Sequence, residues 1–420
     1  MTGHDAKRRI VITGMGVVSP IGIGLNAYWQ ALLEGRIGIG PIEAFDASDY
    51  PCRIAAEVHG FKATDFFDRK KARLLSRGTK FGVASALMCL EDAKWSEETD
   101  SVALGVSAGI SNSPQDTVEE AVMQLRDRGY RRTLPYQLNK SLPHSLASET
   151  GSLTGFQHNV MTFSTACTAG INAIGYAVDE IRAGRVRAML CPSSDANITQ
   201  YGFGYFCRAG MLTTNNNNNP QTASRPFDRE RDGGVLGEGA ACLLLEDYEF
   251  ARLRRAYIYG EITGFGTSGT GYDATDPERA VPAGMAKAIL GALRSANCHA
   301  RQIDYIGAHG VSDPHLDRWE TQAIKDALGN EAYKTPISSV KGNIGIPQNA
   351  AGSLQLVAAI MALNEGVLPP TVNYETPDPD CDLDYVPNQP RYNKIRRALA
   401  ISHGFNGSDA AILIEKDLLA

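Results

Sequence analysis

The chain has 420 residues, of which 43% are hydrophobic and 42 are glycine, and its formal net charge at pH 7 is -6. This length accommodates two domains or one large α/β unit with two halves, and the negative charge argues against bulk nucleic-acid binding. The longest apolar run, 356–363, is too short to cross a membrane, and the polar N-terminus does not resemble a signal peptide. We therefore expect a cytoplasmic protein with no membrane span.

In the first half of the chain, strand-like segments alternate with helix-like ones. Strands are predicted at 9–13, 103–106, 159–163, 186–191 and 241–245, and helices at 27–33 and 171–181. A second series starts near residue 256, with strands at 256–263, 305–308 and 337–340 and helices at 284–295, 319–328 and 350–363. This alternation predicts a mixed or parallel sheet with helices on its faces, built from two similar halves, 1–255 and 256–420.

Two patterns argue against a metal or a cofactor. The eight cysteines are scattered, without the paired spacing of a zinc site or a disulfide framework. The run Gly264–Gly269 fits the dinucleotide pattern GxGxxG, but residues 270–277 after it read as a polar loop instead of the helix that pyrophosphate needs. We expect no metal, nucleotide or other cofactor.

Cys167 is the most informative residue of the chain. It lies among the small residues of 165–170, between an extended apolar stretch and a helix-like repeat formed by Ile171, Ile174, Val178 and Ile181. The unpaired N–H groups at a helix N-terminus favour a thiolate, so this position predicts a nucleophile at neutral pH. The alternative is a small buried thiol, which is the common environment of a free cysteine.

His309 is the predicted partner of Cys167. It ends a strand-like segment in a glycine-flanked loop, where side chains project out of a sheet, and a cysteine–histidine pair can bind and transfer acyl groups. Asp317 and Glu320 share one face of the following helix, and Lys341 lies in a loop of small residues. Lys341 can pair with either carboxylate and so fix the loop near His309. The alternatives are a purely structural role for His309 and a surface position for Lys341.

In this order, these segments resemble the β-ketoacyl-acyl-carrier-protein synthases, of the elongating type, in the thiolase-fold superfamily of condensing enzymes. The resemblance covers nearly the whole chain and is carried by 11–20, 165–170, 223–233, 237–240, 308–310 and 340–345. It implies a five-layer αβαβα fold of two pseudo-repeated halves. It also implies an acyl carrier protein as partner and a dimer, either of identical chains or with another ketosynthase.

The resemblance assigns roles to individual residues. Cys167 matches the nucleophile, His309 the first catalytic histidine and Lys341 the loop lysine, with Asp317 and Glu320 as structural support. In such enzymes an acyl chain moves from carrier-bound pantetheine to the cysteine. A malonyl thioester then loses carbon dioxide, and its carbanion attacks the acyl-cysteine. The oxyanion hole is expected at the backbone N–H groups of Cys167 and His403. Substrate contacts are expected from Ile110, lining the acyl pocket, and from Phe405 in the C-terminal loop 402–409.

Several positions depart from the family pattern. Ile346 stands where the second catalytic histidine is expected, and its side chain has no hydrogen-bond donor for a developing enolate, so decarboxylation is in doubt. His403 replaces the gating phenylalanine, and Gln355 replaces the glutamate that faces the lysine loop. Three further substrate-binding positions differ, since two pantetheine-contacting threonines are Val311 and Asp313, and an aromatic residue is Gly234.

Three functions remain open at this point. The first is a condensing enzyme that still forms a carbon–carbon bond, with His403 taking over the task of the missing histidine. The second is an acyltransferase or cyclase that keeps the acyl-cysteine but does not decarboxylate. The third is a subunit resembling a chain-length factor, which the presence of both Cys167 and His309 argues against.

Two basic stretches are the expected docking site for an acidic carrier protein. They stand out on a chain that is acidic overall, although such runs are often only solvated surface. The residues concerned are Lys70, Lys71, Arg73 and Arg126.

Overall fold

The computed structural model describes residues 8–96, 103–112, 114–269, 277–405 and 407–416. Within these ranges, an 11-stranded sheet follows the order β11-β10-β14-β15-β9-β1-β8-β7-β5-β6, with β2 (Gly22–Ile23) paired to β1. The first half supplies β1 (Ile10–Ser19), β5 (Leu104–Gly109), β6 (Val160–Phe163), β7 (Ala188–Asp195) and β8 (Gly239–Asp247). The second half supplies β9 (Gly260–Gly269), β10 (Tyr305–Gly307), β11 (Ile337–Ser338), β14 (Arg397–Gly404) and β15 (Ser408–Glu415).

The two halves of the sheet repeat one pattern of pairing. From the centre outward, each half has two antiparallel pairings followed by two parallel pairings, through β1-β8-β7-β5-β6 and β9-β15-β14-β10-β11. The halves meet at β1 and β9, which pair only at Val11 with Glu261 and at Ile12 with Gly260. Two pseudo-repeated halves are therefore present, as the alternation in the sequence predicted.

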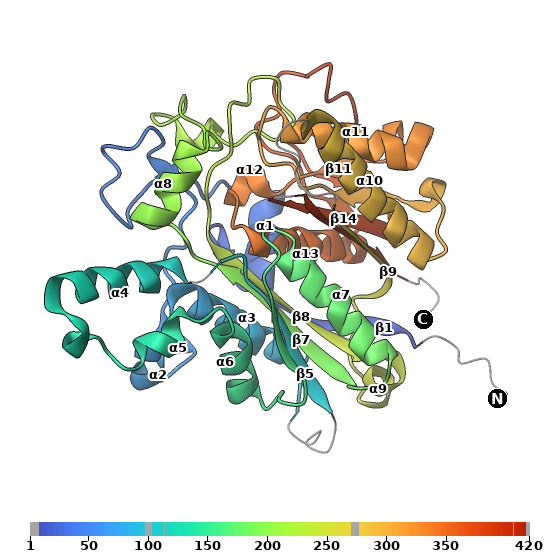
Figure 1. The fold of residues 1–420 in the computed structure, drawn as a ribbon. Coiled ribbons are helices and arrows are strands. Elements are labelled where there is room, and N and C mark those ends of the chain that lie inside the picture. The colour runs from blue at the N-terminus through green and yellow to red at the C-terminus, as the bar shows by residue number, and fades with distance from the viewer. Residues whose placement is uncertain (1–7, 97–102, 113, 270–276, 406, 417–420) are drawn as a thin grey trace.

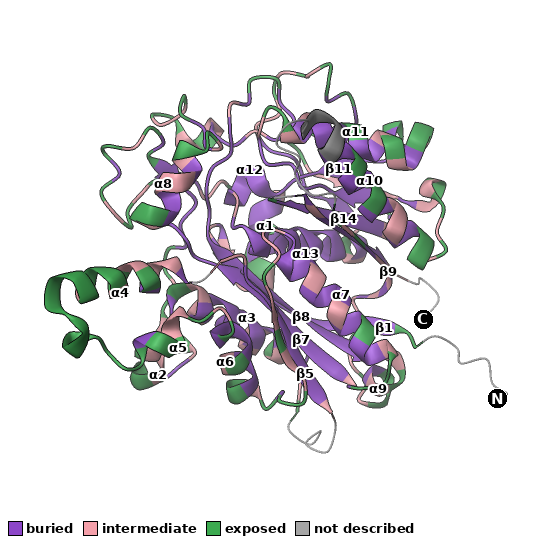
Figure 2. Cartoon of the chain, in the orientation of Figure 1, coloured by how far each residue is buried: buried purple, intermediate pink, exposed green. Residues whose placement is uncertain are grey.

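The two half-sheets and the helices packed against them form five layers (Figure 1). α3 (Arg77–Asp92) covers the outer face of the first half-sheet, and α10 (Pro277–Ser295) with α11 (Leu316–Leu328) covers the outer side of the second. α7 (Ala169–Arg182) and α13 (Asn349–Glu365) lie between the half-sheets and share one hydrophobic core with both. α13 is buried on every side from 349 to 363, because its position between two sheets leaves it no solvent-facing stripe (Figure 2).

The remaining elements lie around these layers. The helices are α1 (Leu25–Leu33), α2 (Arg69–Leu74), α4 (Gln115–Arg128), α5 (Gln137–Ser141), α6 (Ser145–Thr154), α8 (Gln200–Arg208), α9 (Tyr248–Leu253) and α12 (Lys341–Ile344). Two small ribbons pair β3 (Gly40–Pro41) with β4 (Ile54–Ala55) and β12 (Val367–Leu368) with β13 (Arg391–Tyr392). In the described part of the chain, no helix is long and apolar enough to cross a membrane.

The structure corrects two sequence-based expectations, for the strand at 256–263 and for the segment 402–409. The strand expected at 256–263 begins only at Gly260, and the glycine-rich run Gly264–Gly269 lies within β9, where a Cβ at Gly266 would lie 2.1 Å from the Ala288 carbonyl oxygen of α10. Close packing against that helix explains this glycine, and no nucleotide is needed. The loop expected after it, 270–276, lies outside the described residues. Most of 402–409, read as a loop, belongs to the hairpin of β14 and β15.

Candidate active site

Cys167 lies in the tight turn between β6 and α7. The turn passes through Ala166, whose φ of 52° is a left-handed conformation that L-residues rarely adopt, and α7 begins at Ala169. Such strain persists only where the surroundings hold it, and here it presents the thiol at the N-terminal end of the predicted helix. Gly170 allows this helix to approach α13, because a Cβ there would lie 2.6 Å from the Ser353 hydroxyl oxygen.

The surroundings of Cys167 favour its thiol over the thiolate. Removal from water raises its pKa to about 12, the carboxylate of Asp195 adds to the rise, and Lys341 opposes it. Desolvation therefore opposes the thiolate that the helix end favours, and the thiolate stays a prediction from the sequence. Deprotonation must accompany the attack of Cys167 on a thioester.

His309 follows β10 and enters the site as a hydrogen-bond donor. Its ring is buried, and desolvation together with the charges of Lys341 and His403 lowers its pKa well below the usual value, so the imidazole is neutral. Its Nδ1 accepts the backbone N–H of His403 at 3.2 Å. Since a neutral imidazole carries one proton, that proton is on Nε2.

Two buried carboxylates hold the loop that carries His309. Glu320 accepts the backbone N–H groups of His309 at 2.6 Å and of Gly310 at 2.7 Å. Asp317 accepts those of Val311 at 2.8 Å and of Ser312, one residue further on, at 3.1 Å. Four consecutive backbone donors are thus fixed by side chains from α11, which is the arrangement expected of structural support.

Lys341 holds His309 from the opposite side. Its Nζ donates to the backbone carbonyl oxygen of His309, not to either carboxylate as the sequence suggested. Burial lowers the pKa of Lys341 and raises the pKa of Glu320, while the opposite charge of each partner counters the shift. Gln355, which stands for the expected glutamate, accepts the N–H of Val340 at 3.0 Å and so faces the lysine segment.

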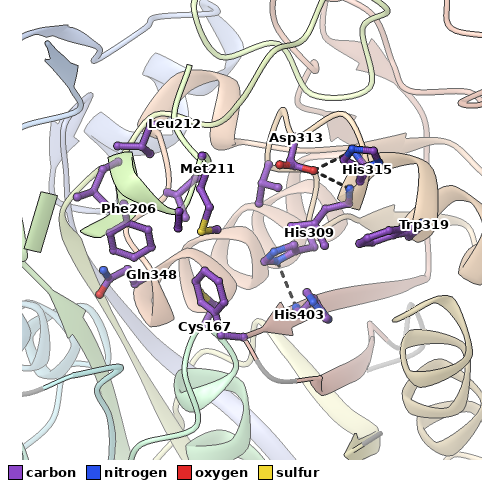
Figure 3. A pocket seen from close by; sticks show the side chains of 17 residues that line it. Cys167, Phe206, Met211, Leu212, His309, Asp313, His315, Trp319, Gln348 and His403 are labelled. Atoms are coloured by element: carbon purple, nitrogen blue, oxygen red, sulfur yellow. Dashed lines mark hydrogen bonds between the residues drawn. The ribbon is translucent and has the colours of Figure 1, made fainter. Parts of the chain in front are cut away.

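His403 lies in β14 and is paired with a carboxylate across the hairpin. Asp409 is its partner in the β14–β15 register, and Asp409 Oδ1 lies 2.7 Å from His403 Nδ1; both side chains are buried. The ring of His403 packs edge-on to that of His309, with centroids 5.8 Å apart (Figure 3). Because the backbone N–H of His403 already donates to His309 Nδ1, this geometry argues against its expected service in the oxyanion hole.

Ile346 and Gly234, two departures from the family pattern, lie against each other. A Cβ built on Gly234 would lie 2.3 Å from Ile346 Cδ1, so the side chain of Ile346 occupies the space that any side chain at 234 would need. The backbone of Ile346 is fixed between Val235, whose carbonyl accepts its N–H at 2.8 Å, and Gly237, whose N–H it accepts at 3.1 Å. The two substitutions are therefore structurally coupled.

A cavity of about 380 Å³ brings together most of the residues that were predicted to be catalytic or to bind substrate (Figure 3). Its walls are mainly apolar, and Cys167, His309 and His403 all line it. The substrate-binding residues predicted from the sequence that also line it are Val311, Asp313, Ile346 and Phe405. Asp313 additionally accepts the N–H groups of His315 and Leu316, each at 2.9 Å, at the start of α11.

Other predicted residues lie outside this cavity. Ile110 is buried and lines neither of the two large cavities beside Cys167, although the next residue, Ser111, lines the second. In α2, Lys70 and Arg73 are exposed, whereas Lys71 pairs with Glu149. In α4, Arg126 is exposed and pairs with its neighbour in the chain, Asp127, at 2.8 Å.

Several polar residues of the site region were not predicted from the sequence. Asp195, at the end of β7, is buried, and desolvation raises its pKa to about 6. Gln348 and Asn349 precede and begin α13, and Asp409 supports His403. Asp409 could have been found from its position opposite His403 across a glycine turn, but no local pattern marks the others.

One group of residues has the spacing of a metal site among the described residues. Ligand atoms of Glu43, Glu57 and His59 lie within 4.8 Å of one another. The buried carboxylate of Glu57 accepts the backbone N–H groups of Glu43, at 3.2 Å, and of Ala44, at 3.0 Å. These hydrogen bonds explain its burial without an ion.

Two family models match most of the chain. The N-terminal domain model of β-ketoacyl synthases matches residues 7–251, and the C-terminal domain model matches residues 259–375. The chain therefore belongs to the β-ketoacyl synthase family.

Relatives of known name cover the whole chain. The chain is 40% identical to 3-oxoacyl-(acyl-carrier-protein) synthase 2 of Synechocystis sp. over 98% of both sequences. It is 37% identical to the ketoacyl synthase alpha subunit of the tetracenomycin polyketide synthase from Streptomyces glaucescens, over 99% of both. Among solved structures, the ishigamide ketosynthase/chain length factor superposes with a TM-score of 0.90 at 31% identity, covering 98% of this chain and 100% of that one. The thiolase-like five-layer fold is confirmed.

Proposed function

We propose that this protein is a condensing enzyme that loads an acyl chain on Cys167 and extends it with a unit from a malonyl-carrier protein, in fatty acid or polyketide synthesis. One observation carries this proposal: Cys167 shares a cavity with His309, a neutral imidazole whose backbone is held by Glu320 and Lys341 and whose proton is on Nε2. Relatives named 3-oxoacyl-(acyl-carrier-protein) synthase and polyketide ketoacyl synthase support this class of reaction.

In the first step the Cys167 sulfur attacks the thioester carbonyl of the carrier-bound acyl group. The carbon–sulfur bond to pantetheine breaks, and the pantetheine thiol leaves with the proton that Cys167 gives up. The tetrahedral oxyanion accepts a hydrogen bond from the backbone N–H of Cys167. We assign the second donor to the backbone N–H of Phe405, since Phe405 lines the cavity and the N–H of His403 is occupied.

In the second step the malonyl carbon loses carbon dioxide, and the resulting carbanion attacks the acyl-cysteine carbonyl. The carbon–sulfur bond to Cys167 then breaks, and the departing thiolate takes one proton from solvent, which restores the cysteine. His309 Nε2–H donates to the thioester oxygen on which negative charge develops. Ile346 offers no second donor, and we propose that His403 supplies it through Nε2, because Asp409 binds Nδ1 and fixes the ring beside the cavity.

The aliphatic Ile346 also favours a second candidate, an acyltransferase that uses the acyl-cysteine without decarboxylation. Both candidates share the first step, so they differ only in the fate of the malonyl group. The alternative of a subunit without catalysis requires that Cys167 stay unmodified.

We propose an acyl carrier protein as the partner, docked on the exposed cations Lys70 and Arg73 of α2 and on Arg126 of α4. The segment from α4 to α5 exposes Val122, Met123, Leu125, Tyr130 and Leu138. These apolar side chains suit burial in a dimer, either of identical chains or with a second ketosynthase. We propose that the reaction takes place in the cytoplasm.

The carrier-protein site can be tested by charge reversal. Lys70→Glu with Arg73→Glu should weaken carrier-protein binding and flatten its salt dependence, whereas Lys394→Glu, at another exposed lysine, should leave both unchanged.

The test of the function uses intact-mass detection and release of carbon dioxide. Incubation with an acyl-carrier protein should add one acyl group, and Cys167→Ala should abolish this adduct while Cys298→Ala retains it. Release of carbon dioxide from malonyl-carrier protein, together with a 3-oxoacyl product, identifies the condensing enzyme. Loading without such release identifies the acyltransferase, and the absence of any adduct on Cys167 overturns both.

A further inference from the structure

A second cavity, of about 690 Å³, adjoins Cys167 and has a different chemical character from the first. Cys167, Phe206, Gln348 and Phe405 line both cavities, so these residues mark the junction between them. Most of the other residues that line the second cavity carry hydroxyl or amide groups, namely Ser111, Asn112, Gln115, Ser164, Thr165, Tyr201, Tyr205 and Ser408. An acyl chain on Cys167 that enters the second cavity therefore meets polar side chains.

Tyr205 holds its hydroxyl group among the residues of this polar wall. It is a half-buried residue of α8, and its ring packs against the ring of Phe206 with the centroids 4.7 Å apart. Its hydroxyl oxygen accepts hydrogen bonds from Gln115 Nε2 at 3.1 Å and from Asn112 Nδ2 at 3.3 Å. Because Tyr205, Gln115 and Asn112 all line the second cavity, these contacts place the hydroxyl group at the cavity wall.

The hydroxyl proton of Tyr205 has no acceptor among the described residues. Two amide N–H groups already donate to the oxygen, so the proton is what this group still has to offer. Burial raises the pKa of Tyr205, and the negative charges of Asp195 and of an ionised Cys167 add to the rise. The hydroxyl group therefore keeps its proton at neutral pH and lies close enough to Cys167 for the two groups to interact electrostatically.

Two other hydroxyl groups of the polar wall donate their protons within the protein. Ser111 Oγ donates to Gln348 Oε1 at 2.5 Å, and Ser164 Oγ donates to the backbone carbonyl oxygen of Ser111 at 3.0 Å. Tyr205 differs from them because its oxygen is fixed while its proton is not used. When a bound chain displaces water from the cavity, the Tyr205 proton needs an acceptor on that chain.

We infer that the Tyr205 hydroxyl group donates a hydrogen bond to a keto or hydroxyl oxygen of the acyl chain on Cys167. Tyr205 then determines specificity, because the second cavity takes chains that carry oxygen and disfavours saturated chains. A saturated chain would remove water from the Tyr205 proton and offer no acceptor in return, and sites built to pair a substrate oxygen discriminate against analogues that lack it. This inference rests on the proposed function, because it takes Cys167 as the acyl acceptor.

The test compares small thioesters of equal chain length, so that carrier-protein docking plays no part. The full chain is incubated with the N-acetylcysteamine thioesters of octanoate, 3-oxooctanoate and 5-oxooctanoate, whose ketones lie at two distances from the thioester. In each transfer the donor carbon–sulfur bond breaks, N-acetylcysteamine leaves as the thiol with the proton that Cys167 gives up, and the new thioester forms on Cys167. Initial loading rates are measured by intact mass.

The decisive quantity is the ratio of the faster ketone's loading rate to that of octanoate, compared between the parent and variants. Tyr205→Phe keeps the ring and removes only the hydroxyl group, so it should lower this ratio about tenfold. Tyr205→Leu, which also lacks the hydroxyl group, should do the same. Tyr392→Phe, at an exposed tyrosine, should leave the ratio unchanged. Thermal unfolding confirms that each variant is folded, and one folded variant at Tyr205 suffices.

An unchanged ratio in a folded Tyr205 variant overturns the inference and leaves the proposed function intact. A parent protein that loads octanoate faster than both ketones overturns the inference without any variant. A protein in which none of the three thioesters loads on Cys167 overturns the proposed function, and this inference falls with it. These failures are therefore distinguishable in the same experiment.

Discussion

Two sides of the cavity around Cys167 are built on different principles. The His309 side consists of residues 309–312. Every backbone N–H of this segment donates to a carboxylate, and Lys341 donates to the backbone carbonyl oxygen of His309. On the Ile346 side, formed by Gly234, Ile346 and Gln348, an aliphatic side chain fills the space over a glycine, and the buried amide nitrogen of Gln348 has no hydrogen-bond partner among the described residues. The protein therefore holds His309, a hydrogen-bond donor, in a rigid loop, whereas the Ile346 side opposite it departs from the family pattern.

The largest effect is expected on the His309 side. Glu320→Ala removes the acceptor for the backbone N–H groups of His309 and Gly310 and leaves Asp317 as the other carboxylate near Lys341. We expect the free energy of unfolding to fall by about 3 to 5 kcal/mol, because each buried N–H group that loses its acceptor costs about 1 to 3 kcal/mol. Chemical denaturation measures this, and Glu365→Ala, at an exposed residue of the same half, is the control. A loss below about 1 kcal/mol would mean that the two sides are equally tolerant.

A second effect concerns the histidine that faces the Ile346 side. His403→Phe should lower the rate of condensation by about 10²-fold while acyl loading persists, because it removes a positioned donor in the second step only. Ile346→His should raise release of carbon dioxide from malonyl-carrier protein. Radiolabelled malonyl groups measure both. If His403→Phe changes only the preferred chain length, His403 shapes the pocket and has no part in decarboxylation.

A third prediction tests the coupling of Gly234 to Ile346. Gly234→Ala places a methyl group where Ile346 Cδ1 lies, so we expect a loss of about 1 to 3 kcal/mol in unfolding free energy. Ile346→Ala in the same chain makes room and should recover a substantial part of that loss. A double-mutant cycle measures the interaction, and strict additivity of the two changes would show that the residues are independent.

The sequence predicted what repeats locally and what resembles a family. The periodicity of 171–181 predicted α7, and the glycines beside His309 predicted the loop that follows β10. The hairpin of β14 and β15 was missed, because its glycine and polar residues are those of a turn. The orientation of Gln348 depends on Ser111 and Asn197, which are distant in sequence, so no local pattern contains it.

The same limit explains why the effect of burial on the thiol was not predicted. A helix N-terminus is visible in sequence, whereas the desolvation of Cys167 and its proximity to Asp195 arise only when distant segments pack together. The roles of Cys167, His309, Lys341 and His403 remain predictions, and the structure adds to them the contacts on which each role depends.

The smallest effect should appear in the reactivity of Cys167 itself. With a thiol pKa of about 12, the rate of alkylation by iodoacetamide should rise about tenfold per pH unit from pH 7 to 9, whereas an ordinary cysteine levels off near its pKa of about 8.5. Asp195→Asn removes a negative charge that disfavours the thiolate, so it should lower the thiol pKa and speed alkylation several-fold. Since the pKa of Asp195 is raised to about 6, this carboxylate is charged above pH 6 and neutral below it. The difference between the variant and the parent should therefore be present above pH 6 and shrink as the pH falls below 6. A difference that does not depend on pH would show that Asp195→Asn acts by changing access to the sulfur, not by removing a charge.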